Sequence, residues 1–216
     1  MRKYLAFLLL PLLATLLQGC APKPQEDCGF VQNVYGERIS WKGEVPVTMY
    51  LHESVPAEYV RAIESAAGTW QDASGKKLFN IVTNQRVSGP INPQKDSKNV
   101  IYYFNTWESD KGSEQARTSI YWIGDQIKEA DMRINAATNP VTKLPYFAYY
   151  WNQPGSTTPE PANAINIEAL VIHELGHVLG LKHKDKDASV MATYLASNTD
   201  RTNIPDTDRS AVQCEY

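Results

Sequence analysis

Apolar and polar positions in the first half of the chain form short segments that predict several β-strands and one helix. Residues 45–52 alternate apolar and polar side chains, which is typical of a half-buried strand. A helix is expected next, because Ser54 and Pro56 are start signals. Its apolar positions recur at steps of three and four and are Val60, Ile63, Ala67 and Trp70. Further strands are predicted at residues 78–84, 99–105, 118–124 and 129–135, which turn-forming residues separate.

The second half of the chain contains a proline-rich segment, a strongly apolar helix and a short terminal helix. Residues 139–161 are too rich in proline for a regular element and predict a long loop. Its aromatic side chains can pack beneath the loop or border a binding site, and we favour packing; they are Tyr146, Phe147, Tyr149, Tyr150 and Trp151. Residues 166–179 are apolar in nearly every direction, which predicts a central buried helix. Residues 205–216 predict a last short helix.

The N-terminus has the layout of a secretory signal. Residues 1–19 comprise a basic head, an apolar run too short to span a membrane comfortably, and a terminal glycine. Residues 17–20 resemble a bacterial lipobox, which predicts lipidation of Cys20; the alternative is ordinary signal cleavage nearby, and export is expected in either case. By the same resemblance, Ala21 favours the outer membrane. We expect residues 20–35 to form a tether and residues 36–216 to form one catalytic domain, monomeric and without repeats.

The charge balance excludes one class of partner. The formal net charge is −3 with 24 acidic side chains, and removal of the signal segment takes away two basic ones. An acidic chain is poorly suited to bind a phosphate backbone, so nucleic acid is not an expected partner.

The motif HELGHVLGLKH, residues 173–183, contains three of the four histidines. A shuffled chain would contain this arrangement on the order of a few times in a million. Residues four apart on a helix face the same side, so His173 and His177 can bind one ion. In a continued helix, His183 would be rotated by roughly 240° and lie about 9 Å further on. The helix must therefore end before His183, and Gly180 can adopt the left-handed conformation that ends it.

The motif has the donor set of a catalytic zinc site. Three neutral imidazoles leave the fourth position of a tetrahedral Zn²⁺ for water, and Glu174 can accept a proton from that water. Two alternative explanations do not involve catalysis: the histidines could be ordinary core residues, and Glu174 could be a solvent-exposed carboxylate on the helix. The number and spacing of the histidines disfavour the first, and the apolar surroundings of Glu174 disfavour the second.

From these residues the sequence resembles the metzincin metallopeptidases, and within them the matrixins. Met191, eight residues after His183 in SVMATY, is similar to the methionine of the family's Met-turn, and AVQCEY is similar to its last helix. The resemblance implies an α+β fold with a twisted, mostly parallel five-stranded sheet, an antiparallel edge strand, an active-site helix and a small C-terminal subdomain. It also implies an edge strand that pairs with an extended peptide substrate, with residues Thr118, Ile120 and Trp122.

The sequence departs from the family at two positions and in its metal count. Lys184 replaces the usual serine, and Tyr194 follows Met191 by an unusual three residues, which puts a metal-binding role for Tyr194 in doubt. His52 is the only histidine outside the motif, so one zinc is expected. The carboxylates Asp110, Asp125 and Glu160 could bind calcium, but scattered carboxylates usually solvate a surface.

Cys28 has two interpretations. It is faintly similar to the propeptide cysteine that keeps matrixins latent by binding their zinc. Alternatively, if Cys20 is lipidated, Cys28 and Cys214 remain as a pair, and an even pair in an exported protein is usually bridged. We favour the disulfide.

The sequence is compatible with two functions. The first is a zinc endopeptidase, and the second is a lipoprotein that binds a partner and keeps the metal only as a support. A structural zinc needs no buried base, so Glu174 favours the peptidase. The wall of the substrate pocket is expected at residues 193–204, whose conformation the sequence does not determine.

Overall fold

The computed structural model describes residues 24–90, 93, 95–153, 161–186, 188–197 and 199–216. The predicted signal segment 1–19, the predicted lipidation site Cys20 and the calcium candidate Glu160 lie outside these residues.

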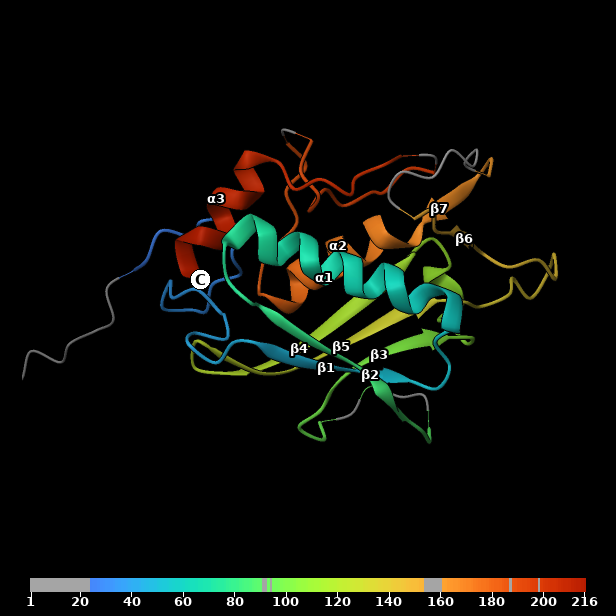
Figure 1. Cartoon of the computed structure of the whole chain (residues 1–216), viewed down its shortest axis with the longest axis horizontal. Helices are drawn as coiled ribbons and strands as arrows, with labels where there is room; N and C mark the ends of the chain where they lie inside the picture. The colour runs from blue at the N-terminus through green and yellow to red at the C-terminus, as the bar shows by residue number, and fades with distance from the viewer. Residues whose placement is uncertain (1–23, 91–92, 94, 154–160, 187, 198) are drawn as a thin grey trace, which may run out of the picture.

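A five-stranded sheet forms the framework of the molecule (Figure 1). Its spatial order is β2–β1–β3–β5–β4, in which only β4 runs antiparallel to its neighbour. The strands are β1 (Val47–His52), β2 (Phe79–Val87), β3 (Asn99–Phe104), β4 (Ala116–Ile123) and β5 (Gln126–Asn135). The predicted α+β fold, with a mostly parallel sheet and an antiparallel edge strand, is confirmed.

Helices α1 (Val60–Ser74) and α2 (Ile167–Val178) lie on the same side of the sheet in Figure 1. The indole of Trp70 is fully buried between them and donates a hydrogen bond to the carbonyl of Ile172 at 2.8 Å. The last helix is α3 (Asp206–Glu215), and two short 3₁₀ turns lie at η1 (Ala57–Tyr59) and η2 (Ser109–Lys111). The core therefore lies between the sheet and the two long helices.

The strands extend further than their apolar segments. Pairing of β4 with β5 runs from Ala116 opposite Ile134 to Ile123 opposite Gln126. It therefore includes polar residues that the alternation of apolar and polar side chains did not assign to a strand. Main-chain hydrogen bonds need no apolar side chains, and a tight hairpin continues pairing up to its turn. Strand β1 begins at Val47 and not at Val45, since Pro46 has no N–H to donate.

The prediction that residues 139–161 contain no regular element is wrong. Within them, β6 (Ala148–Tyr150) pairs in parallel with β7 (Ala164–Asn166). This pairing joins distant segments, so local composition could not predict it. Tyr150 is buried, and Phe147, Tyr149 and Trp151 pack against the core, which agrees with the packing interpretation of these aromatic residues.

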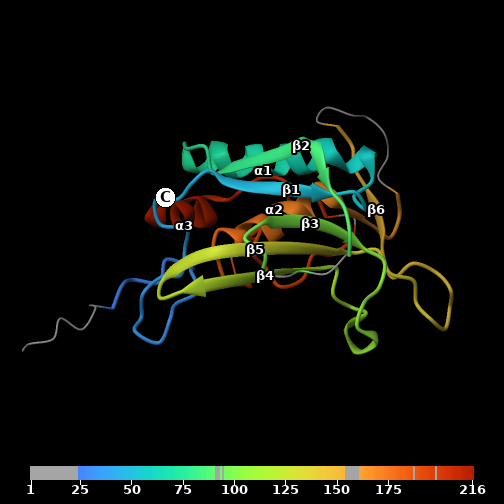
Figure 2. The same ribbon diagram turned by 90° about the horizontal axis from the view of Figure 1, so that it is seen from below.

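Part of the segment predicted as a tether is built into the domain. Phe30 is fully buried in the core and forms an antiparallel bridge with Leu181 (Figure 2 shows this end of the chain from another side). The packed body therefore begins before residue 36. No helix within the described ranges is long and apolar enough to cross a membrane.

Candidate metal centre

Helix α2 carries the first two histidines through the middle of the domain. Asn166 caps it, since its side chain accepts hydrogen bonds from the N–H groups of Glu168 at 2.9 Å and Ala169 at 3.5 Å. Every residue of α2 except His177 is buried. Because packing on all sides holds the helix, its functional side chains have little freedom to move.

The helix ends as the motif predicted, through a left-handed glycine. Gly180 has φ +101°, its N–H donates to the carbonyl of His177 at 2.9 Å, and the N–H of Leu181 donates to the carbonyl of Gly176 at 3.0 Å. These two bonds are those of a Schellman motif. The turn redirects the chain, so that His183 comes back towards the helix.

The three imidazoles converge on one point. The Nε2 atom of His177 lies 3.1 Å from that of His173 and 3.1 Å from that of His183. Within the described part of the chain these three side chains are the one group of His, Cys, Asp and Glu able to share an ion. His52 and the calcium candidates Asp110 and Asp125 do not belong to it.

Hydrogen bonds at the opposite ring nitrogens orient two of the imidazoles. The Nδ1 of His173 donates to the carbonyl of Val190 at 2.8 Å, and the Nδ1 of His177 donates to that of Leu181 at 2.8 Å. Each Nε2 therefore carries its lone pair towards the common point. Burial lowers the pKa of His173 to about 3, and desolvation of the half-buried ring lowers the pKa of His177 to about 4, so both rings are neutral at pH 7. The donor set and its orientation fit a zinc ion held by three neutral nitrogen ligands.

Glu174 lies between the helix and the edge strand. It is buried, and its Oε2 accepts a hydrogen bond of 2.6 Å from the hydroxyl of Thr118 on β4. Burial raises the pKa of Glu174 to about 7, and the Thr118 hydrogen bond opposes that rise. The sequence predicted Thr118 only as a residue of the substrate strand and missed this contact, because nothing local relates positions 56 residues apart.

Met191 lies beside the histidines, in a turn that α3 holds. Ser189 donates its hydroxyl to both carboxylate oxygens of Asp208, at 2.8 and 2.9 Å, and the N–H of Val190 donates to Asp208 at 2.7 Å. A Cβ at Gly176 would collide with the sulfur of Met191, so the methionine packs directly against the turn of α2 between the two helical ligands. The buried Asp208 was not predicted, since an aspartate near a helix start is ordinarily an exposed cap.

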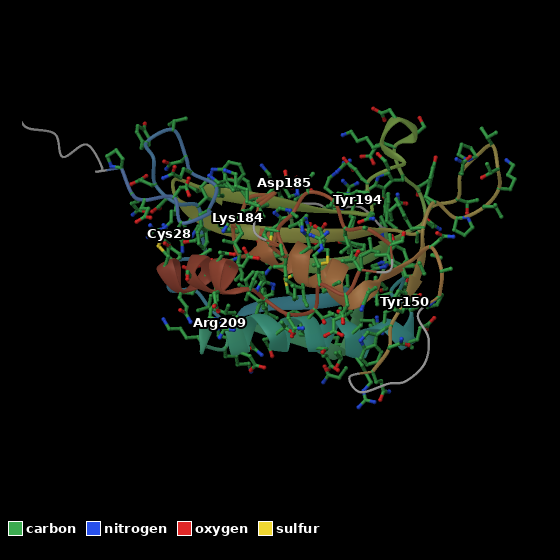
Figure 3. All side chains as sticks on the ribbon, turned by 90° about the horizontal axis from the view of Figure 1, so that it is seen from above. Cys28, Tyr150, Lys184, Asp185, Tyr194 and Arg209 are labelled. Carbon is green, nitrogen blue, oxygen red and sulfur yellow. A yellow bond between two sulfur atoms is a disulfide. The ribbon has the colours of Figure 1, made fainter. Side chains whose placement is uncertain are left out.

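Lys184 and Tyr194, the two residues that depart from the matrixin pattern, do not disturb the arrangement of the histidines. The N–H of Lys184 donates to the carbonyl of Met191 at 2.8 Å, a main-chain contact that does not depend on the side chain. Tyr194 is 71 % exposed and borders the cleft described next, on the same side of the molecule as Lys184 and Asp185 (Figure 3).

A cleft of about 620 Å³ contains the three histidines and Glu174. Strand β4, whose Thr118 and Ile120 line it, forms one wall, and residues 192–195 form another. Leu170 and Leu195 line its apolar part, and the side-chain amide of Gln115 donates to the carbonyl of Leu195 at 2.7 Å. Trp122 is 41 % exposed further along β4. Since β4 is an edge strand, no other strand of the described residues pairs with its outer side.

Comparison with known proteins agrees with this geometry. The family model Peptidase_M10, described as Matrixin, matches residues 47–216. The chain belongs to the matrixin family. A relative of this matrixin is Metalloendoproteinase 1 of Glycine max, 29 % identical over 68 residues, which are 31 % of the chain and 22 % of the soybean protein. The matched part thus covers about a fifth of that relative's length.

The structure of this matrixin also decides between the two interpretations of Cys28. Cys28 and Cys214 form a disulfide with their Cα atoms 6.3 Å apart. Cys28 is therefore bonded to α3 and does not lie at the histidines as a latency ligand would.

Proposed function

We propose that this matrixin is a zinc-dependent endopeptidase that hydrolyses peptide bonds in extended protein segments. The observation that carries the proposal is the convergence of three Nε2 atoms beside a buried glutamate in one cleft. His173, His177 and His183 would hold the zinc, and Glu174 would act as the general base.

The metal and the glutamate would have separate tasks. Bound zinc would supply a Lewis acid that polarises the substrate carbonyl and makes water more acidic. The carboxylate of Glu174 accepts the proton of the attacking water and then passes it to the leaving amine. A pKa near neutrality suits both transfers, because the group must gain and release a proton within one cycle. The Thr118 hydroxyl holds one carboxylate oxygen and leaves the other for this task.

The substrate would lie along β4 as an added strand. Main-chain hydrogen bonds to a free sheet edge bind any extended segment, and side pockets select among side chains. Ile120 and Trp122 lie along this strand beyond Thr118, and the part of the cleft bordered by Leu170 and Leu195 would receive an apolar side chain. The competing proposal, a non-proteolytic binding lipoprotein with a supporting zinc, gives no role to the buried Glu174.

The test is Glu174→Ala, assayed on casein and on a quenched peptide library together with zinc content. Activity should fall by at least about 100-fold, the usual contribution of a general base, while about one zinc per chain remains. Glu64→Ala, which removes an exposed glutamate from α1, is the matched control and should leave both values unchanged. Wild-type protein that cleaves nothing at any zinc loading would refute the peptidase. Loss of zinc from Glu174→Ala would show that the carboxylate supports the metal site.

A further inference from the structure

Residues 27–31, here called the N-terminal strap, lie against the segment that joins the second and third histidines. Phe30 forms an antiparallel bridge with Leu181. The N–H of Val31 donates to the carbonyl of Gly180, and the N–H of Lys182 donates to that of Gly29, both at 2.9 Å. Asp27 adds an ion pair of 2.7 Å with Lys182. The strap therefore holds residues 180–182 as a neighbouring strand would.

This contact reaches two of the three histidines. Leu181 is bridged to the strap, and its carbonyl accepts the hydrogen bond that orients His177. His183 follows only two residues later, so its position depends on the path of the same segment. The buried ring of Phe30 and the carbonyl of Ile39 also close around Gly180. A displaced strap would thus disturb one imidazole through its hydrogen bond and another through the main chain.

The strap also borders the cleft. Val31 lines it together with Leu181 and His183. Its N–H holds Gly180, and its carbonyl accepts a hydrogen bond from the N–H of Ile39 at 2.8 Å. Both the N–H and the C=O group of Val31 therefore form hydrogen bonds within the domain.

A disulfide connects the strap to α3. Cys28 is bonded to Cys214 across 186 residues of sequence, and Figure 3 shows Cys28 beside this helix. The same helix supplies Asp208, which holds Ser189 and Val190, and the carbonyl of Val190 orients His173. Helix α3 is consequently tied to both sides of the metal centre, by a covalent bond to the strap and by hydrogen bonds to the turn of Met191.

We propose that the N-terminal strap is a positioning segment for His177 and His183, and that the Cys28–Cys214 disulfide keeps it in place, so that reduction weakens zinc binding. The inference rests on the proposed zinc site. Reduction by a phosphine breaks the S–S bond, transfers an oxygen atom of water to phosphorus and leaves two thiols. The phosphine is oxidised and the disulfide gains two electrons and two protons. The freed segment then keeps only its non-covalent contacts with residues 180–182.

The experiment measures zinc affinity by competition with a chromophoric chelator, independently of peptide cleavage. The double variant Cys28→Ser, Cys214→Ser should bind zinc about 10-fold or more weakly than wild type, as is usual when groups that orient metal ligands are lost. Phosphine treatment should weaken binding to a similar degree in wild type and have no effect on the double variant. The serine variant also excludes zinc binding by the released thiols.

Two further variants separate positioning from general loss of stability. Phe30→Ala keeps the disulfide but removes the buried side chain of the strap, and it should also weaken zinc binding. Val55→Ala shortens a buried side chain outside the strap and should leave zinc affinity unchanged even if the melting temperature falls. Should the double serine variant fail to fold, the rate of zinc release from reduced wild type, compared with oxidised wild type, decides the matter.

The outcomes are distinct. Affinity within about two-fold of wild type in the folded serine variant, or an unchanged release rate after reduction, overturns the strap proposal alone. A wild-type protein that binds no zinc overturns the proposed function and the strap together. A wild-type protein that binds zinc without cleaving peptides refutes the peptidase but leaves the strap supported if the affinities differ as expected.

Discussion

Gly176 and Gly180 are four residues apart in the metal-binding motif, yet each is required by a different neighbour. At Gly176 a side chain would collide with the sulfur of Met191. At Gly180 the backbone has positive φ, and a Cβ would also collide with the carbonyl of Ile39. The second requirement was predictable from the spacing of the histidines, because the helix has to end there. The first depends on a methionine 15 residues later and was not.

Gly180→Val should therefore damage the metal centre without removing a ligand. A β-branched residue at positive φ costs about 1–3 kcal/mol of strain, and the collision with Ile39 displaces the turn further. Zinc affinity should fall, as measured by competition titration. Gly75→Val is the matched control, because Gly75 ends α1 at φ +73° with open space around it. It should lower stability but retain zinc affinity. Wild-type affinity in Gly180→Val would show that the turn tolerates another backbone conformation.

Asp131 gives a pH-dependent prediction away from the metal centre. Burial, with Glu129 and Asp96 nearby, raises the pKa of Asp131 to about 7, while Arg133 and a hydrogen bond from the N–H of Val100 oppose the rise. The folded state therefore holds this proton to higher pH than the unfolded state does. The contribution of protonated Asp131 to the free energy of unfolding is fully present below about pH 4, and it is lost as the pH rises towards 7.

The variant Asp131→Asn keeps the acceptor for Val100 and removes the charge. It should melt at least about 2 °C higher than wild type at pH 8, which corresponds to roughly 0.5–1 kcal/mol in a chain of this length. At pH 4 the two melting temperatures should agree. The measurement is thermal unfolding across this pH range, and a constant difference at all pH values would contradict a titrating Asp131. The phenol of Tyr102 also lies near this carboxylate, and its pKa of about 12 keeps it neutral throughout the range.

At the scale of elements, α2 was predicted almost to its ends. The predicted range 166–179 compares with Ile167–Val178 in the structure, where Asn166 is the cap and Leu179 the last partly helical residue. Apolar residues on every face identified it as buried, and two local signals, the histidine spacing and the glycine, determined its C-terminal limit; the cap at Asn166 was seen only in the structure. Strand β6 shows the contrary case. Its three residues become a strand only because β7 is brought beside them, so no local pattern marks it.

Asn166→Ala should cost about 1 kcal/mol of unfolding free energy, within the usual range for loss of an N-cap. Two N–H groups would lose their acceptor in a buried environment. Urea unfolding measures the loss. Asn166→Ser restores a side-chain oxygen and should recover most of it. If the alanine and serine variants are equally stable, the cap hydrogen bonds contribute nothing measurable.

At the scale of the whole molecule, we propose that the chain is exported and anchored to a membrane through a lipid on Cys20. The support is the basic head, apolar run and lipobox-like residues of the N-terminus. Only a few residues separate Cys20 from Pro24, and four extended residues span at most about 14 Å. An anchored domain would therefore stay close to the membrane surface.

Cys20→Ser should release the protein in soluble form, whereas Cys28→Ser, the control, should leave it in the membrane fraction. Cell fractionation and the mass of the N-terminal peptide report the result. Native protein that is already soluble and begins at another residue would contradict lipidation. Because this assay does not depend on zinc or peptide cleavage, it tests the anchor independently of the proposed function.

The sequence by itself determined the local chemistry: which residues can bind zinc, where their helix ends, and which segments form the sheet. These properties depend on helical periodicity, alternation and the freedom of glycine, and all of them act within a few residues. Tertiary structure decided the contacts between distant segments. It brought Thr118 to Glu174, Asp208 to the turn of Met191, and Phe30 to Leu181. Such contacts depend on how the elements pack around a shared core, and a linear pattern does not contain that arrangement.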